Sequence, residues 1–284
     1  EMKDTRLEGV VNVDASMTPA GADRQLSRLA ADFRVQDLVV AGVLSEPFRL
    51  GRADGSMGAT ARIQGGLPES FRDLKLSLQS DPLNAEATVA ELSGFSGIET
   101  LQARDLSAEM SSDIPKVTAM ARSLGFVPEG MDAAGNLELS LSGGVKDGVV
   151  DMSKISGLLT DASLSVGQKT IREPRLSLSA SGRADLAKQS LALGETRLEL
   201  TPGHFTLSDI KVPDWSDPVA GLTGAFEGTV DTARLLAQAG DFVNLPKDTE
   251  VSGTLNISGD LASRRAGQDV NVQAGLKPLT VRRP

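Results

Sequence analysis

Residue types that could support catalysis are scarce in this chain of 284 residues. His204 is the only histidine, and the chain contains no cysteine. A Cys–His nucleophile and a metal site built from several histidines are therefore excluded. His204 lies on the polar phase of a strand-like run, opposite Phe205 and Leu207, which is the position of a solvent-facing strand residue.

Carboxylates are numerous but scattered. Among the 38 acidic residues, Glu138 and Glu199 occupy polar positions of predicted strands, where a solvated side chain is the ordinary arrangement. Asp113 and Asp231 each precede a helical pattern and suit a helix N-cap better than an active site. No phosphate-binding or calcium-binding loop motif occurs in the sequence. We therefore expect no enzyme activity, no catalytic residue, no metal site and no cofactor.

Net charge and hydropathy limit the classes of partner and the relation to a membrane that we expect. The formal net charge is −9 and the charges are dispersed, which argues against nucleic acid as a partner because phosphate neutralisation needs clustered Lys and Arg. No window approaches the ~18 consecutive apolar residues of a membrane-spanning helix. The sequence begins at Glu1 without a signal-like leader, so we expect an excised segment whose membrane anchor lies outside it.

Alternation of apolar and polar residues dominates the chain. Leu137, Leu139 and Leu141, for example, alternate with Glu138 and Ser140. Such a period of two predicts antiparallel strands with one apolar and one wet face. The residues that we select for the apolar face share this pattern. They are Leu137, Leu139, Leu141, Leu164, Val166, Leu176, Leu178, Leu191, Leu193, Leu198, Leu200, Leu255 and Ile257.

Turn signals separate the alternating runs at intervals of about 8–12 residues, the spacing of an antiparallel meander. They include Ala53-Asp54-Gly55 and Ser142-Gly143-Gly144. Three segments carry helical spacing instead: 114–124, 232–240 and 23–32. No linker-like composition divides the chain, so we expect residues 1–284 to form one continuous segment.

The apolar phase is compatible with two architectures. In a closed β-sandwich, two sheets would bury it between them. In an open curved sheet it would stay partly uncovered, as a surface for apolar ligands or partners. Periodicity alone favours the closed sandwich.

A phrase of the sequence occurs twice. Residues 113–142 align with residues 231–260 without a gap, and Pro128 and Gly135 coincide with Pro246 and Gly253. Each copy predicts a capped helix, a loop with proline and a strand. Self-similarity at fixed spacing indicates a repeated architecture. The distance between the copies leaves room for roughly ten strands of ordinary length.

The repeated phrase, D-x-x-x-V/L-x-A-x-A followed by P-x-x-x-x-x-x-G-x-L-x-L/I-S, resembles the units of AsmA-like envelope proteins of the TamB/YhdP type. The run Gly135-Asn136-Leu137-Glu138-Leu139-Ser140 and its counterpart from Gly253 to Ser258 carry the resemblance. It covers about residues 100–276 well and the first 99 residues loosely.

The resemblance implies a mainly β fold: an elongated, twisted antiparallel sheet curved into a groove, a β-taco, with a few short helices. It implies a periplasmic location, with an inner-membrane anchor outside this segment. The apolar phase would then line a groove that carries phospholipid acyl chains between the inner and outer membranes, with envelope proteins of both membranes as partners. Two alternatives stay open, an outer-membrane protein assembly factor and a closed β-sandwich adhesin or scaffold.

Overall fold

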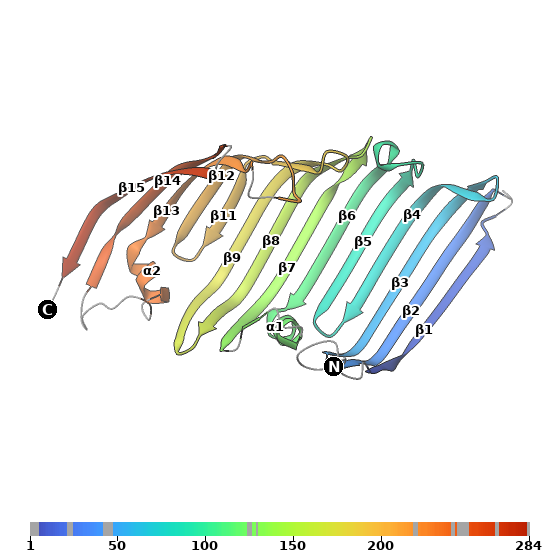
Figure 1. The fold of residues 1–284 in the computed structure, drawn as a ribbon, viewed down its shortest axis with the longest axis horizontal. Helices are drawn as coiled ribbons and strands as arrows, with labels where there is room; N and C mark the ends of the chain where they lie inside the picture. Colours follow the sequence, from blue (N-terminus) through green and yellow to red (C-terminus); the bar gives the residue numbers. More distant parts are fainter. Residues whose placement is uncertain are drawn as a thin grey trace.

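The computed structural model describes residues 6–21, 25–41, 48–123, 127–128, 130–217, 221–239, 242, 250–264 and 267–282. The strands in these ranges form one antiparallel sheet of fifteen strands (Figure 1). Their bounds are Arg6–Pro19 (β1), Leu26–Ala41 (β2), Phe48–Gln64 (β3), Leu67–Ser80 (β4), Leu83–Ser93 (β5), Gln102–Asp113 (β6), Met131–Lys146 (β7), Val149–Val166 (β8), Lys169–Asp185 (β9), Ser190–Leu193 (β10), Thr196–Leu200 (β11), Gly203–Val212 (β12), Thr223–Asp231 (β13), Glu250–Arg264 (β14) and Gly267–Arg282 (β15).

The sheet is a meander in which each strand pairs with the one before and the one after it in sequence. β10 and β11 are the exception, because both lie between β9 and β12 and together occupy one strand position. Fourteen strand positions therefore follow one another across the sheet. The predicted fold class, a mainly β elongated antiparallel sheet with few helices, is confirmed. The closed sandwich is wrong for the described residues, since their strands belong to a single sheet.

Two helices interrupt the meander at equivalent points. α1 (Ile114–Ser123) joins β6 to β7, and α2 (Thr232–Ala239) joins β13 to β14. Asp113 accepts a hydrogen bond from the backbone N–H of Lys116 at 3.2 Å, and Asp231 accepts one from Arg234 at 3.0 Å. The predicted N-caps are thus confirmed. A short 3-10 turn, η1 (Ile98–Thr100), lies between β5 and β6.

Three expectations from the sequence are wrong. Residues 23–32 were expected to be helical; residues 23 and 24 lie outside the described residues, and Leu26 begins β2, which pairs with β1 and β3. Ala53-Asp54-Gly55 and Ser142-Gly143-Gly144 were expected to be turns, yet they lie inside β3 and β7. Because the strands reach 18 residues, one period of the repeat contains seven strands, β7 to β13, instead of about ten.

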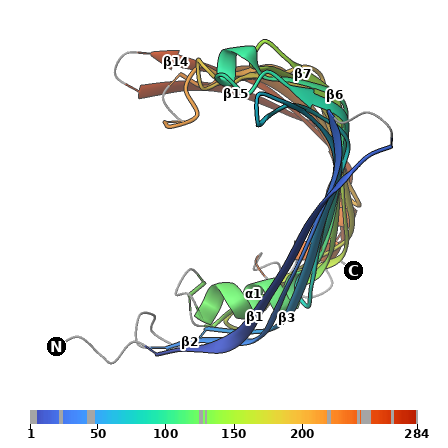
Figure 2. The same cartoon turned by 90° about the vertical axis from the view of Figure 1, so that its right-hand side faces the viewer.

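The sheet is curved along the direction of its strands, so the long strands are bent. Viewed along the long axis of the sheet, the strands follow a C-shaped arc with α1 inside it (Figure 2). Five strands contain an Asp with positive φ, near 50°, and each of these Asp residues lies at a break in the pairing register. They are Asp37, Asp73, Asp105, Asp161 and Asp209.

These register breaks are β-bulges, which bend the bulged strand and increase its twist. Asp tolerates the left-handed conformation better than most residues. At two bulges the neighbouring strand contributes a glycine with positive φ, Gly9 beside β2 and Gly135 beside β8. A Cβ on Gly135 would come within 2.9 Å of the carbonyl oxygen of Thr160, so the strands approach too closely there for a side chain. The curvature of the sheet thus follows from residues placed within its strands.

Candidate functional site

The two faces of the sheet differ in chemistry along its whole length. Residues directly opposite each other on neighbouring strands share a face, so the pairing register defines rows that cross the sheet. We call one of these row A. It contains only apolar residues and glycine at all fourteen strand positions. Row A runs Val13, Phe33, Gly55, Leu78, Ala85, Met110, Leu139, Gly157, Leu178, Leu198, Phe205, Gly228, Ile257 and Ala274.

Two parallel rows widen this apolar face. Row B begins at Ala15 and passes through Ala31, Met57, Leu76, Ala87, Ala108, Leu141, Ile155 and Ala180. Row C connects Leu137, Leu159, Leu176, Leu200, Gly203, Val230, Leu255 and Leu276. In each hairpin the pairing register places the apolar residues of both strands on the same face. The alternating sequence therefore produces a continuous apolar surface.

The apolar face lines a groove. A cavity of about 700 Å³ extends along it from Val13 of β1 to Ile155 of β8. Side chains of rows A and B form its floor, among them Phe33, Leu78 and Met110. α1, which lies inside the arc in Figure 2, contacts β3, where Ala53 on this face is only 5% exposed. The apolar face is therefore the concave one.

The residues selected from the sequence fall into several groups. Leu139 and Leu141 line the cavity. Leu178, Leu198 and Ile257 continue row A beyond it, and Leu137, Leu176, Leu200 and Leu255 belong to row C. Leu191 pairs with Ala184 and Val212, and Leu193 with Gly182 and Ile210, nearer the end of the strands. Leu164 and Val166 lie past the Asp161 bulge beside the turn from β8 to β9, outside the three rows.

Three glycines of the sheet lie opposite phenylalanines, a role that the sequence alone did not indicate. Phe33 lies opposite Gly55, Phe205 opposite Gly228, and Phe226 opposite Gly259. In each pair a Cβ on the glycine would overlap the phenylalanine ring. The ring thus occupies the space above the glycine, an arrangement by which aromatic residues cover strand glycines.

The convex face is polar in the same systematic way. One row on it reads Asp14, Asp32, Ser56, Ser77, Glu86, Glu109, Ser140, Ser156, Ser179, Arg197, Thr206, Glu227, Ser258 and Gln273. Hydroxyl pairs such as Ser140 and Ser156, 2.6 Å apart, connect neighbouring strands. His204 lies opposite Glu199 and Thr229 on this face, as expected for a solvated strand residue.

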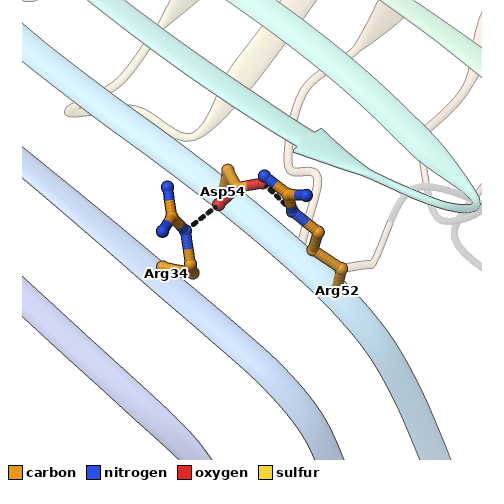
Figure 3. Close-up of polar contacts among 3 residues, drawn as sticks. All are labelled: Arg34, Arg52 and Asp54. Atoms are coloured by element: carbon orange, nitrogen blue, oxygen red, sulfur yellow. Dashed lines mark hydrogen bonds and ion pairs between the residues drawn. The ribbon is translucent and has the colours of Figure 1, made fainter.

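Ion pairs on the convex face bracket single acids between two arginines. Asp54 accepts hydrogen bonds from Arg34 on β2 and Arg52 on β3 (Figure 3). These two guanidinium groups lower the pKa of the Asp54 carboxyl below its ordinary value. Glu91 pairs in the same manner with Arg72 at 3.9 Å and Arg104 at 3.3 Å. The arginines in both groups are more than half exposed, so these pairs contribute little to stability.

Within the described ranges, no cluster of three or more His, Cys, Asp or Glu residues has an arrangement that could hold a metal ion. None of the helices in that part of the chain is long and apolar enough to cross a membrane. The most extensive candidate site is therefore the apolar groove, whose chemistry suits contact with hydrocarbon rather than bond making. Comparison of the chain with protein-family models, with curated proteins and with solved structures finds no match.

Proposed function

We propose that this chain is the periplasmic part of an AsmA-like envelope protein and that its groove carries phospholipids between the inner and outer membranes. The observation that supports this proposal best is row A, which crosses all fourteen strand positions without a polar side chain. The resemblance of residues 113–142 and 231–260 to AsmA-like units supplies the envelope context.

The dimensions of the groove suit acyl chains that lie along its axis. Neighbouring strands are about 4.8 Å apart, so fourteen strand positions extend over roughly 60 Å. Each methylene that leaves water for the groove contributes about 0.8 kcal/mol. Because rows A and B offer few polar side chains to fix a particular position, a chain can slide without losing directional contacts. Binding that depends on the buried apolar area, without directional contacts, suits transport better than storage.

The open side of the arc suits the headgroup. In Figure 2 the concave side faces solvent along one side of the sheet, so a headgroup can remain in water while its acyl chains contact rows A and B. Polar rows on the convex face keep the outer surface wetted. Envelope proteins of the two membranes would deliver and receive the lipid at the ends of the groove.

A matched pair of substitutions tests the proposal. Ala87 lies on row B in the cavity lining, and Thr88 follows it on the opposite, exposed face of β5. The wild-type protein and the Thr88→Glu variant should retain phospholipid that mass spectrometry detects after solvent extraction. Ala87→Glu should stay folded by circular dichroism and lose most of that lipid, because its carboxylate would contact the acyl chains.

Several outcomes would count against the proposal. Absence of phospholipid from the wild-type protein would overturn it, and so would equal lipid retention by both variants. Photo-crosslinking from position 87 separates lipid transport from the assembly of outer-membrane proteins. Crosslinks to lipid support transport, whereas crosslinks to unfolded outer-membrane proteins would favour the assembly role.

A further inference from the structure

Two methionines differ chemically from the other apolar residues that line the groove. Met57 of β3 lies in row B and Met110 of β6 lies in row A, and both line the cavity of about 700 Å³. The other apolar side chains of that lining consist of carbon and hydrogen only. A thioether sulfur is apolar as well, but it can accept an oxygen atom and then becomes strongly polar. The groove floor thus contains two positions whose polarity can change by a chemical reaction.

The sulfur of Met57 is open to the groove. Met57 lies opposite Ala31 on β2 and Leu76 on β4, and Ala59 follows it on the same face of β3. The two alanine side chains end at Cβ and leave part of Met57 uncovered, so that this residue is 37% exposed. Oxidation of a methionine requires that the oxidant reach its sulfur, and in the empty groove Met57 meets this requirement.

Met110 lies among neighbours that offer no hydrogen-bond donor on the groove face. It is opposite Ala85 on β5 and Leu139 on β7. Ser112, two residues further along the same face of β6, donates its hydroxyl hydrogen to the carbonyl oxygen of Pro82 at 2.9 Å. An oxygen atom added to Met110 would therefore find no donor among these side chains and would depend on water for its hydrogen bonds.

A sulfoxide on this floor would affect the lipid-bound state more than the empty state. In the empty groove, water can hydrate the added oxygen, so the sheet needs no rearrangement. An acyl chain that lies across Met57 or Met110 would displace this water. A polar group that loses water without gaining another hydrogen bond raises the free energy of the bound state. Oxidation should therefore weaken the binding of hydrocarbon and leave the fold intact.

We propose that Met57 and Met110 are modification sites at which a peroxide oxidises the groove and lowers its affinity for acyl chains. This inference rests on the proposed function, because it concerns the same groove. In the reaction, a sulfur lone pair attacks one oxygen of the peroxide, the O–O bond breaks and an S=O bond forms. With hydrogen peroxide, the departing hydroxide takes the proton of the transferred oxygen and leaves as water. The thioether is oxidised and the peroxide is reduced.

Hydrogen peroxide treatment of the lipid-free protein tests the proposal. Peptide mass spectrometry should detect one added oxygen on Met57 and Met110 at lower peroxide doses than on Met152, which is only 9% exposed. The binding probe is cis-parinaric acid, a fatty acid whose fluorescence rises in apolar surroundings. At that dose its affinity should fall about tenfold, while the circular dichroism spectrum stays unchanged.

Leucine variants separate these two sites from the other methionines. The double variant Met57→Leu, Met110→Leu nearly conserves side-chain volume and should bind the probe equally well before and after peroxide treatment. The control Met152→Leu keeps both groove methionines and should lose affinity like the wild type.

The outcomes distinguish this inference from the proposed function. Equal loss of affinity in the double variant would overturn the inference and leave the lipid groove standing. Unchanged probe binding by wild-type protein that carries both sulfoxides would do the same, as would oxidation of Met152 before Met57 and Met110. A wild-type protein that binds no probe before oxidation would contradict the proposed function, and the inference with it.

Discussion

Replacing Gly55 with alanine tests how the groove floor is built. In the structure Gly55 lies opposite Phe33, and a Cβ at position 55 would overlap the ring. The φ angle of Gly55 does not lie in the positive region, so the backbone itself accepts alanine. The entire loss of stability therefore comes from the overlap with the Phe33 ring, which must rotate away from residue 55. Because Phe33 is 40% exposed toward the groove, the ring has space to turn away.

Two effects of opposite sign determine the size of the change. Overpacking costs about 1–3 kcal/mol, and the free space beside Phe33 places this site near the lower end. Replacing glycine also restricts the unfolded chain, which stabilises by roughly 0.4–1 kcal/mol. Gly55→Ala should thus destabilise the wild type by roughly 1 kcal/mol or less. In a Phe33→Ala background the clash is absent, and the same change should stabilise.

Denaturant unfolding of the wild type, the two single variants and the double variant measures the coupling between the sites. We expect a coupling free energy of about 1 kcal/mol, at equal denaturant slopes. Equal effects of Gly55→Ala in both backgrounds would refute the reasoning. Gly143 offers a contrast, because a Cβ there would overlap the backbone carbonyl oxygen of Asp151. Trimming Phe33 should leave the cost of Gly143→Ala unchanged.

Three further predictions concern the acids. Asp231→Ala removes the cap of α2 and should cost about 1 kcal/mol, with faster amide hydrogen exchange in α2 but not in β12; uniform exchange across both would contradict the cap. Asp73 has a φ of 51° and should tolerate asparagine. In denaturant unfolding, Asp73→Val should lower the free energy of unfolding by about 1–2 kcal/mol more than Asp73→Asn. Equal losses in the two variants would contradict the bulge argument. Arg34 lowers the folded pKa of Asp54, so the stabilisation is present above the unfolded pKa and disappears as pH falls through the folded value. Because the pair is exposed, Asp54→Asn should lower the urea midpoint only slightly at pH 7 and should match the wild type in acid. A difference in midpoint that persists at low pH would argue against the ion pair.

Local sequence features predict the elements that depend on local physics. Alternation around Leu139 identifies strands and their faces, because side-chain direction in a strand follows from chain geometry alone. Asp113 and Asp231 are recognisable as caps, because a cap acts on amides three residues away. The apolar face of the sheet is therefore predictable from the order of the residues alone.

Features that depend on a neighbouring strand are not predictable in this way. Gly55 has the sequence context of a turn, since Asp-Gly is a turn signal, but its role is set by Phe33 across the strand pair. Residues 23–32 have weak helical spacing, yet pairing with β1 and β3 overrides it in β2. The choice between a closed sandwich and an open sheet also depends on long-range packing, which periodicity does not contain.

Because each bulge with an aspartate bends its own strand, the length of the sheet and the curvature of its cross-section are independent of each other. Each strand makes its main contacts with its immediate neighbours in the sheet, and Asp105 bends β6 without reference to strands farther away. Inserting or removing a two-strand hairpin would thus change the length by roughly 10 Å and leave the arc of every other strand intact. Duplication of hairpins can therefore change the length of such a sheet without changing the cross-section of its groove.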